Sequence, residues 1–320
     1  MGDVIHNLPV ISDIRRRFPD AVIDWVVEES FMEIPRLHPG VRHVIPMAWR
    51  RWRKSLFDST IRQQIAEFRR ELKAETYDVV LDTQGLLKSA AIGLMAHGEH
   101  RGYNLQSARE PLAACFYQRR FAVSKQMHAV ERNRALAAKA LGYELDALPL
   151  DYGIAAPMTS TFLIPEKPYA VLLHATSRDD KLWPEKDWIE LGKRLAKQGL
   201  HCQLPWGNDK EKIRSERLAG AIAQSQIPER LRLTDAAVLL ANATVVVGVD
   251  TGLTHLAAAL GVNVVALYVA TAHGLTGVYG ERNAINLGST GERPALEVVW
   301  EKVFSFIAPK GVTSIDGNRY

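Results

Sequence analysis

The sequence predicts an α/β protein built from two domains with mostly parallel sheets. The chain has 320 residues, which is about the length of two domains of ordinary size. In both halves, short runs of β-branched residues alternate with amphipathic helical stretches, as they do in βαβ units. The apolar runs lack polar alternation, which is typical of strands that helices cover on both faces of a parallel sheet.

The first half is expected to alternate strands with helices and to end in a linker. The expected strands are 21–29, 41–46 and 77–85. The expected helices are 60–75, 88–98 and 128–142. The next segment, 144–157, contains turn residues and prolines and has no sustained periodicity. We interpret it as the linker between a domain of residues 1–150 and a domain of residues 151–320.

The second half repeats the alternation. Its expected strands are 169–177, 201–207, 244–252 and 263–269. Its expected helices are 184–198, 209–222 and 253–260. Two such domains joined by one linker imply a cleft, and ligands of open α/β sheets bind at the carboxyl ends of the strands. Motifs that directly follow strands are therefore the candidates for chemistry.

Composition excludes several classes of protein. Hydrophobic residues make up 47% of the chain and charged residues 24%, as in soluble folded proteins and unlike disordered or collagen-like chains. No apolar run reaches the ~18 residues that a membrane-spanning helix needs, and the N-terminus carries no visible export signal. Two cysteines, Cys115 and Cys202, are too few for a disulfide framework or a structural zinc site. A cytoplasmic protein is expected.

Positive charge is concentrated in one window. The net charge of the chain is +4, but between Arg42 and Lys73 nine Lys or Arg stand against three Asp or Glu. Such a patch predicts an anionic partner, which is nucleic acid, an anionic lipid surface or a phosphorylated substrate. At its centre lies R-R-W-R-K, 50–54, whose cations can clamp phosphates while Trp52 stacks or inserts. A solvated loop is the alternative.

The motif V-D-T-G-L-T-H, 249–255, follows an expected strand and opens an alanine-rich helix. Asp250 and Thr251 are good N-cap residues, and Gly252 permits a close approach of the backbone. The N–H groups at the helix start, aided by the helix dipole, can bind an anion to which His255 also donates. The alternative is a capped helix with a tight turn and a partly exposed histidine.

A second motif, H-A-T-S-R-D-D-K-L-W-P at 174–184, also follows a strand. Thr176 and Ser177 offer hydroxyl groups, and Lys181 can reach a diphosphate as a point charge. Trp183 is expected to pack in the core. The alternative for the polar residues is a solvated loop that precedes the next helix.

A third, weaker motif is P-W-G-N-D-K-E, 205–211, where a strand runs into a helix. Glu211 can hold ribose hydroxyls, as acidic residues do in other nucleotide-binding α/β folds. Favourable placement of its charge against the helix dipole explains Glu211 equally well.

Several enzyme signatures are missing from the sequence. No G-x-G-x-x-G follows a strand and no Walker A loop is present, which argues against a simple dehydrogenase and a P-loop NTPase. No G-x-S-x-G nucleophile elbow occurs. The run H-G-E-H, 97–100, has the wrong spacing for a zinc site and lacks a third ligand.

Taken in order, the motifs resemble those of the ADP-heptose-using heptosyltransferases, which are glycosyltransferase family 9 and have the GT-B fold. The resemblance covers nearly the whole chain, and its segments are MGDVIHNLP, DWVVEE, RRWRK, DTQGLLKSA, AREPLA, HAVER, HATSRDDKLWP, LPWG and VDTGLTHLAAAL. It implies two Rossmann-like domains that face a central cleft. Residues 1–150 would bind the acceptor and residues 151–320 the nucleotide-sugar donor.

The resemblance also implies a reaction and roles for individual residues. Heptose would be transferred from ADP-L-glycero-β-D-manno-heptose to the first Kdo of Kdo2-lipid A with inversion, and Asp3 would be the general base. The donor-binding residues would be Thr176, Ser177, Lys181, Glu211, Asp250, Thr251, Gly252 and His255. The acceptor-binding residues would be Arg50, Arg51, Arg53, Lys54, Lys88 and Arg109. No cofactor, metal or nucleic acid is implied.

The resemblance further places the protein in the cytoplasm, peripheral to the inner membrane. Family members carry about ten residues before this Met-Gly-Asp, which form the first strand of the N-terminal sheet. That strand is expected to be missing here, which leaves Asp3 at a chain end that a sheet does not hold.

Other functions stay open on the residues alone. The chain can be another heptosyltransferase of the same family, a nucleotide-sugar epimerase, or a nucleotide-binding form whose truncation impairs catalysis. The basic loop at 50–54 favours a large anionic acceptor, which an epimerase lacks. Nucleic-acid binding is a further alternative for the basic patch, but no nucleic-acid-binding module accompanies it.

Overall fold

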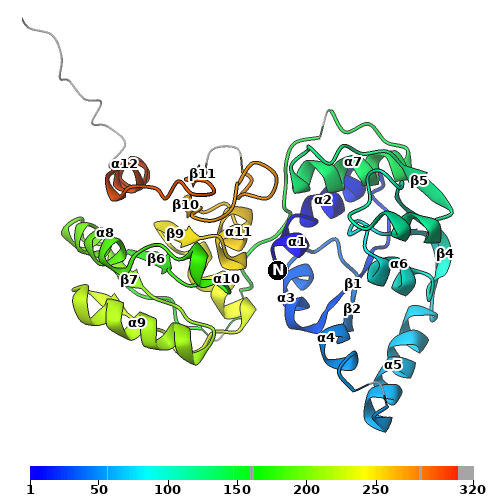
Figure 1. Cartoon of the computed structure of the whole chain (residues 1–320), viewed down its shortest axis with the longest axis horizontal. Coiled ribbons are helices and arrows are strands. Elements are labelled where there is room, and N and C mark those ends of the chain that lie inside the picture. The colour runs from blue at the N-terminus through cyan, green and yellow to red at the C-terminus, as the bar shows by residue number, and fades with distance from the viewer. Residues whose placement is uncertain (56, 147, 159, 161, 281–282, 309–320) are drawn as a thin grey trace, which may run out of the picture. The chain divides into compact units, whose positions relative to one another are not determined.

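The computed structural model describes residues 1–55, 57–146, 148–158, 160, 162–280 and 283–308 (Figure 1). It divides into two compact units. Unit 1 comprises Met1–Pro157 with Gly274–Thr276, and unit 2 comprises Met158–His273 with Gly277–Tyr320. The division falls after Pro157, whereas the predicted boundary follows residue 150. Residue 147 of the predicted linker and residues 309–320 of the C-terminal tail lie outside the described residues.

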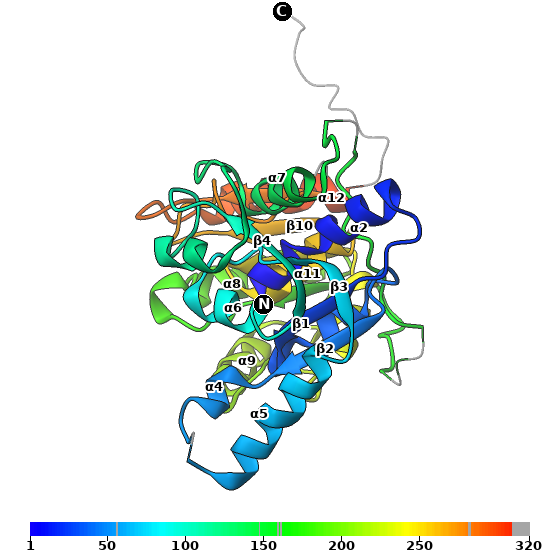
Figure 2. The ribbon, with the colours of Figure 1, turned by 90° about the vertical axis from the view of Figure 1, so that its right-hand side faces the viewer.

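Unit 1 contains two small parallel sheets (Figure 2). β1 (Asp24–Glu28) pairs with β2 (His43–Met47). The second sheet has the order β3 (Thr76–Leu81), β4 (His97–Tyr103) and β5 (Arg119–Phe121). A hydrogen bond of 2.8 Å from the Tyr77 hydroxyl to Asp24 Oδ2 connects the first strands of the two sheets.

Short helices surround these sheets. They are α1 (Gly2–Ile5), α2 (Leu8–Arg17), α3 (Glu33–Arg36), α4 (Trp49–Trp52), α5 (Ser59–Leu72), α6 (Leu87–Gly93) and α7 (Ala129–Leu141), with 3₁₀ helices η1 (Glu29–Phe31) and η2 (Pro111–Phe116). α5 begins because the carboxylate of Asp58 accepts hydrogen bonds from the amides of Thr60 and Ile61. α7 ends at Gly142, whose φ of 77° places it in the left-handed region.

Two predictions for unit 1 were wrong in their boundaries. The strand expected at 77–85 ends at Leu81, because the side chain of Asp82 turns the chain. The helix expected at 88–98 ends at Gly93, and β4 begins at His97. β4 and β5 were not predicted, since their sequences HGEHRGY and RRF lack the apolar β-branched runs that indicate a buried strand.

A buried ion pair joins α2 to α7. Arg134 donates to the two carboxylate oxygens of Asp13 at 2.8 and 3.0 Å, and the side chains are only 5% and 1% exposed. The same guanidinium donates to the carbonyl of Leu148 at 2.9 Å. One side chain therefore satisfies a buried carboxylate and also holds the segment that follows α7.

Replacing Arg134 with Met should destabilise unit 1 strongly. The change leaves a buried carboxylate without its partner, which typically costs about 3–5 kcal/mol of unfolding free energy. The matched control is Arg16→Met, because Arg16 pairs with Asp151 where the side chains are 37% and 43% exposed. The control should cost under about 1 kcal/mol. Urea unfolding followed by circular dichroism measures both, and equal losses would contradict the prediction.

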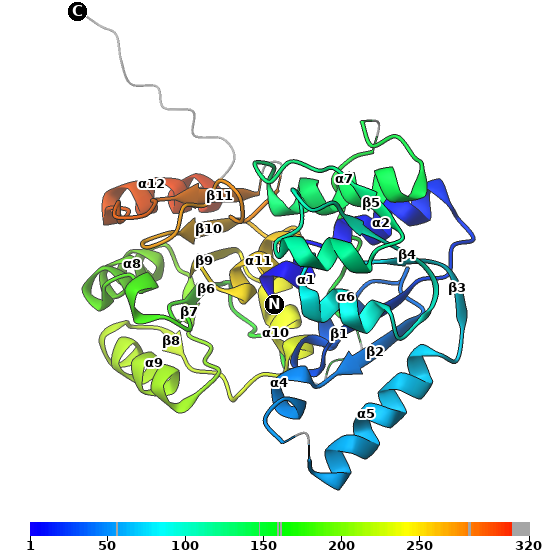
Figure 3. The ribbon, with the colours of Figure 1, turned by 45° about the vertical axis from the view of Figure 1, so that its right-hand side comes forward.

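Unit 2 is a six-stranded parallel sheet with helices on both faces (Figure 3). The strand order is β11 (Ala284–Leu287), β10 (Val264–Leu267), β9 (Val245–Val249), β6 (Tyr169–Leu173), β7 (His201–Gln203) and β8 (Ser225–Gln226). One face carries α8 (Glu185–Lys197), α9 (Asp209–Ala221) and α12 (Leu296–Ile307). The other carries α10 (Leu233–Ala241) and α11 (Gly252–Ala259).

The central strands were predicted because they are fully apolar. All residues of β6, β9 and β10 are buried. Trp183 is also fully buried and packs perpendicular to Trp188, with 5.1 Å between ring centroids, which confirms its predicted place in the core. The predicted elements of this unit all occur, with shorter strands. β8, β11, α10 and α12 were not predicted.

The sheet topology places the candidate motifs together. β9, β6 and β7 are neighbours, so the loops that follow them start at adjacent points of one sheet edge. Gly248 in β9 also allows α11 to pack closely, because a Cβ at this position would lie 2.3 Å from Thr254 Oγ1. That hydroxyl donates to the carbonyl of Val249 at 2.7 Å. In the part of the chain that the structure describes, every helix is too short or too polar to cross a bilayer.

Candidate active site

The carboxylate of Asp250 is the centre of a polar cluster at the carboxyl end of β9. Its Oδ2 accepts hydrogen bonds from Lys181 Nζ at 2.6 Å and from Thr271 Oγ1 at 2.9 Å. Its Oδ1 lies 3.8 Å from His255 Nε2. Its main-chain carbonyl accepts a hydrogen bond of 3.0 Å from Thr176 Oγ1. The loops after β6, β9 and β10 and the first turn of α11 therefore meet at one point.

The Asp250 cluster contains a partly buried ion pair between Lys181 and Asp250. Burial alone would raise the pKa of the Asp250 carboxyl, but hydrogen bonds from His255, Lys181 and Thr271 outweigh burial and hold that pKa well below its ordinary value. The side chains of Lys181 and Asp250 are 17% and 19% exposed, so solvent screens their charges weakly. The ion pair thereby holds the Lys181 side chain beside the start of α11.

The start of α11 is not capped as the sequence predicted. Thr251 is the N-cap residue, but its side chain makes no capping hydrogen bond, and the carboxylate of Asp250 binds Lys181 and Thr271 instead. The N–H groups of the first turn, from Gly252 onward, thus remain uncapped by side chains at the positive end of the helix dipole. His255 is 6% exposed, rather than partly exposed as the alternative required. This arrangement suits an anion better than a simple helix cap.

Glu211 is part of a reciprocal cap at the start of α9. Its carboxylate accepts hydrogen bonds from the Gly207 amide at 2.7 Å and from Asn208 Nδ2 at 2.8 Å. The Glu211 amide donates to Asn208 Oδ1 at 3.0 Å. The alternative that Glu211 serves the start of the helix is therefore correct in part, because its carboxylate stabilises the N-terminus of α9. Its binding of a ribose stays a prediction.

Two loops of unit 2 are tied together at the surface. Lys210 at the start of α9 donates to both carboxylate oxygens of Asp179 at 2.7 and 2.8 Å. Asp179 begins the 3₁₀ helix η3 (Asp179–Lys181), which carries Lys181. Ser177 lies just before this helix and is exposed. The loops after β6 and β7 thus lie side by side, although such an exposed pair adds little stability.

In unit 1, Asp3 is bound by Arg109. Asp3 lies in α1, and its two oxygens accept hydrogen bonds from Arg109 Nη2 and Nη1 at 3.0 and 3.1 Å. Burial would raise the pKa of the Asp3 carboxyl, but the hydrogen bond and charge of Arg109 lower it below the ordinary value. Arg109 was predicted to face the acceptor, whereas its guanidinium is already engaged by the predicted base.

The loop after β3 positions Arg109. The buried carboxylate of Asp82 accepts hydrogen bonds from the Gly85 amide at 3.2 Å and from the Tyr117 hydroxyl at 2.7 Å. Gly85 has a φ of 65°, and a Cβ there would lie 3.2 Å from the Arg109 amide. The Gly85 carbonyl accepts a hydrogen bond of 3.0 Å from Glu110 N. Only glycine fits this approach without strain.

The cations of the segment 50–54 differ in their surroundings. Arg51 donates to Glu29 Oε2 at 2.9 Å and to Gln64 Oε1 at 2.6 Å. The Arg50 guanidinium lies 5.5 Å from the centroid of the Phe31 ring. Arg53 and Lys54 are exposed, as is Lys88 on α6. The segment begins within α4, so the expected loop is partly helical.

The predicted role of Trp52 was wrong. Its side chain is 6% exposed, packs on Phe68 at 5.4 Å between ring centroids, and donates from Nε1 to Gln64 Oε1 at 3.2 Å. It is a core residue that anchors the segment and cannot stack on a ligand. Trp49 is the more exposed aromatic residue of this segment, at 37%. Local sequence did not distinguish the two, because both lie among arginines.

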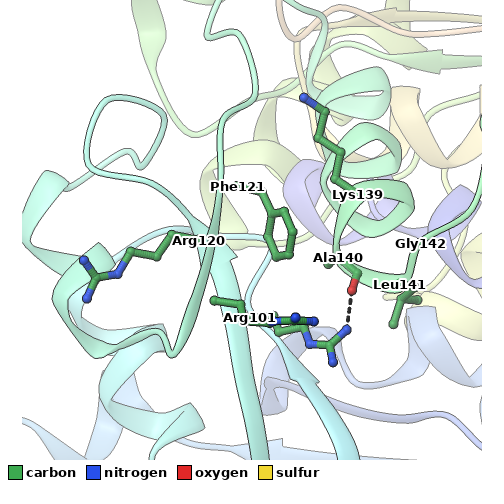
Figure 4. Close-up of a pocket in the computed structure, with 8 residues that line it drawn as sticks. Arg101, Arg120, Phe121, Lys139, Ala140, Leu141 and Gly142 are labelled. Carbon is green, nitrogen blue, oxygen red and sulfur yellow. Dashed lines mark hydrogen bonds between the residues drawn. The ribbon is translucent and has the colours of Figure 1, made fainter.

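Unit 1 also contains a cavity lined by basic residues, which does not include the segment 50–54. It has a volume of about 410 Å³ between β4, β5 and the end of α7. In Figure 4, Arg120 and Lys139 point away from it, and the Arg101 guanidinium is occupied by the carbonyl of Ala140. None of the predicted site residues lines it. The Arg101 guanidinium is therefore engaged in a structural contact.

Solved structures define the class of protein. The chain is similar to Escherichia coli heptosyltransferase WaaC with ADP, with a TM-score of 0.89 and 44% identity over 96% of this chain and 97% of that one. It is similar also to WaaC with ADP-2-deoxy-2-fluoro heptose, with a TM-score of 0.84, 44% identity and 96% of both chains covered. The parallel-sheet units are those of a GT-B glycosyltransferase, as the sequence predicted.

The family follows from the sequence relatives. The model of glycosyltransferase family 9 (heptosyltransferase) matches residues 65–302. Lipopolysaccharide heptosyltransferase 1 of Escherichia coli (strain K12) is 46% identical over 299 residues, which are 90% of this chain and 94% of that protein. The chain belongs to glycosyltransferase family 9 and is a heptosyltransferase. The predicted resemblance is confirmed.

Two residues of these sites were missed in the sequence. Thr271 donates a hydrogen bond to Asp250, which lies 21 positions earlier in the chain. Its position after an expected strand is the one sequence signal that could have pointed to it. Asp82 also follows a strand, β3, within a segment that contributed to the resemblance. Neither lies in a motif whose spacing specifies a partner.

Proposed function

We propose that this enzyme transfers L-glycero-D-manno-heptose from ADP-L-glycero-β-D-manno-heptose to the first Kdo of Kdo2-lipid A in lipopolysaccharide inner-core synthesis. The observation that carries the donor assignment is the Lys181–Asp250–Thr271 cluster beside the uncapped start of α11. It offers a cation and main-chain N–H groups to a diphosphate. The WaaC structures that contain ADP and an ADP-heptose analogue support the same donor.

The leaving group is the ADP anion. As the bond between the anomeric carbon and the diphosphate oxygen breaks, negative charge grows on that oxygen. Lys181 and the start of α11 stabilise this charge, and Thr176, Ser177, Thr251, Gly252 and His255 surround the diphosphate. Such preorganised donors are usually the largest single contribution to the rate. Glu211 holds the ribose of ADP by accepting hydrogen bonds from its hydroxyls.

Asp3 acts as the general base. Its carboxylate takes the proton of the acceptor hydroxyl while that oxygen bonds to the anomeric carbon from the side opposite ADP, which inverts the configuration. The ion pair with Arg109 supports this role, because it keeps Asp3 ionised and oriented. A general base must be deprotonated and within hydrogen-bond reach of the proton that it removes.

Replacing Arg109 with Gln should shift the pH dependence of kcat/KM. Arg109 lowers the pKa of the Asp3 carboxyl, so its removal raises that pKa and protonates the base at a higher pH. The acid limb of the profile should therefore move to higher pH. Arg109→Lys, which keeps the charge, should move it less. An acid limb that is unchanged in Arg109→Gln would contradict the assignment of Asp3 as the titrating base.

The exposed cations of the segment 50–54 bind the phosphorylated acceptor. Arg50, Arg51, Arg53, Lys54 and Lys88 lie in the same unit as Asp3 and are all exposed. Arg53 and Lys54 are the best placed in the segment, because Arg51 is engaged by Glu29 and Gln64 and Arg50 lies over the Phe31 ring. Lipid A phosphates and Kdo carboxylates are anions that guanidinium and ammonium groups recognise. The lipid-linked acceptor further supports a cytoplasmic enzyme in peripheral contact with the inner membrane.

Neutralising Arg53 and Lys54 together to Gln should raise the acceptor KM. Each cation near an anionic surface contributes roughly 1 kcal/mol, so the pair should change KM by about thirtyfold at low salt. The salt dependence should flatten, and ADP affinity should not change. The control is Arg69→Gln with Arg70→Gln, two exposed cations of α5. Parallel loss of ADP binding would show that the segment is misassigned.

Product analysis by mass spectrometry tests the proposed reaction. ADP-heptose and Kdo2-lipid A should give an acceptor that carries one added heptose. A chain that is another heptosyltransferase of the family should instead modify an acceptor that already carries the first heptose. A chain that binds ADP and modifies neither acceptor would be a nucleotide-binding but catalytically impaired form. Either of these outcomes would overturn the proposal.

A further inference from the structure

The helices α6 and η2 of unit 1 form one packed pair. Ala90 of α6 is fully buried in a cluster with Ala113, Ala114 and Tyr117 of the η2 region. Small side chains in this contact bring the two backbones close together. The contact between the two helices has little room for their larger apolar side chains. Those side chains therefore pack elsewhere in unit 1 or face solvent.

The outer surface of this pair is apolar. Leu94 is 56% exposed, Leu112 64%, Leu87 39% and Phe116 37%. Leu87 and Leu94 are seven positions apart and lie on the same side of their helix. Ala91, Pro111 and Cys115 are exposed as well. We call these seven residues the α6–η2 patch, because they are exposed apolar residues of two helices that pack on one another, and such clustering is typical of an interaction site.

Cations border the α6–η2 patch. Lys88 lies at the start of α6, and Arg119 and Arg120 begin β5, directly after the patch; all three are exposed. Figure 4 shows Arg120 pointing to the side of β5 opposite Lys139. Two acids also lie at this border: the carboxylate of Glu110 accepts a hydrogen bond of 2.6 Å from the Leu87 amide, and Glu99 Oε1 lies 3.6 Å from Arg119 Nε. The border is therefore net positive around an apolar centre.

The α6–η2 patch is also continuous with the site of the predicted base. Arg109, which binds Asp3, lies two residues before η2. The next residue, Glu110, donates from its amide to the carbonyl of Gly85 in the loop that leads into α6. The loop that positions Arg109 thus also positions both helices of the patch. A partner seated on this surface would lie close to the acceptor side of the reaction.

We propose that the α6–η2 patch docks the enzyme on an anionic lipid bilayer, with Leu94, Leu112 and Phe116 entering the interface and the bordering cations contacting headgroups. An apolar centre with a basic border fits the boundary between acyl chains and anionic headgroups. The inference rests on the proposed function, because an enzyme with a lipid-linked acceptor must reach the membrane that holds it. Its test uses neither donor nor acceptor, so the two proposals can fail separately.

The two cysteines allow a direct measurement. Cys115 is an exposed member of the patch, whereas Cys202 is fully buried, and burial raises the pKa of the Cys202 thiol to about 12. A thiol-reactive, environment-sensitive dye should therefore label Cys115 of the native full chain selectively, with Cys115→Ser as the background. Vesicles of phosphatidylglycerol and phosphatidylethanolamine should shift the emission to the blue. Phosphatidylcholine vesicles should shift it less, and added salt should weaken the response.

Variants decide whether the patch itself carries the binding. Leu94→Ser with Leu112→Ser should lower partitioning onto the anionic vesicles by about tenfold or more, measured by co-sedimentation. The matched control is Val22→Ser with Ile213→Ser, two aliphatic residues that are 62% and 53% exposed outside the patch. Thermal melts by circular dichroism show whether each variant is folded.

Three results would overturn the proposal. The first is an emission spectrum unchanged by anionic vesicles, together with no co-sedimentation. The second is equal loss of partitioning in the patch variant and in the control variant when both are folded. The third is self-association through the patch, detected by sedimentation velocity and abolished by Leu94→Ser with Leu112→Ser, without vesicle binding. That last result would assign the surface to a second copy of the chain.

Discussion

Replacing Asp3 with Asn should lower turnover by about 10²–10⁴-fold while ADP binding stays close to normal. The amide has nearly the same shape as the carboxylate but cannot accept the proton of the acceptor hydroxyl, and losses of this size are typical when a general base is removed. ADP binding should persist because the proposed donor residues all belong to unit 2, whereas Asp3 belongs to unit 1. The result would separate chemistry from donor affinity.

The measurement is the initial rate of heptose transfer at saturating donor and acceptor, with ADP affinity from calorimetry. Asp20→Asn, at an exposed acid of the same unit, is the matched control and should be neutral. Asn at position 3 also leaves Arg109 without its carboxylate partner, so Arg109→Gln must be compared. A loss in Asp3→Asn no greater than in Arg109→Gln would mean that the ion pair, and not the base, matters.

Sequence reasoning was strongest where burial alone determines structure. β6, β9 and β10 were predicted because a strand covered on both faces must be apolar throughout, and such a run is visible without knowledge of its neighbours. β4 was missed because its sequence, HGEHRGY, consists of polar residues, glycines and one tyrosine, without an apolar run. Its place in a sheet depends on pairing with β3 and β5, which the local sequence does not encode.

The same distinction applies to the sites. The motif at 249–255 was recognised because strand, polar turn and helix are adjacent in sequence. The partner of Asp250 was not predicted, since Lys181 lies 69 positions away. Arg109 and Asp3 are 106 positions apart, and Asp3 itself was assigned only through the family resemblance. Long-range partners require the fold, whereas local patterns reveal only which residues are available.

Trp52 illustrates a different limit. In the sequence it lies within a run of four cations, a context that suggests an aromatic residue on a binding surface. In the structure it is buried on Phe68 because α4 turns it toward α5. Which side of a short helix faces the core depends on the helix packed against it. The run of cations at 50–54 therefore does not reveal that the Trp52 side chain points inward.

Replacing Lys181 with Ala should lower kcat/KM for the donor by about 10²–10³-fold. One charge-assisted contact to the departing diphosphate is removed, and such contacts typically contribute about 2.7–4 kcal/mol to transition-state stabilisation. The change also leaves the partly buried carboxylate of Asp250 with a hydrogen bond from Thr271 and with His255 nearby, but without its ammonium partner. Its negative charge would then repel the diphosphate, so the single variant alone cannot separate the two effects.

The double variant Lys181→Ala with Asp250→Asn separates them. If Lys181 contacts the diphosphate, removing the carboxylate relieves the repulsion only, and the double variant should stay at least about tenfold below the native enzyme. If Lys181 merely neutralises Asp250, the double variant should recover nearly full activity, because no uncompensated charge remains. Donor-dependent rates and ADP affinities of the native enzyme, both single variants and the double variant complete the cycle. Near-normal activity of Lys181→Ala alone, or full recovery in the double variant, would remove Lys181 from the diphosphate site.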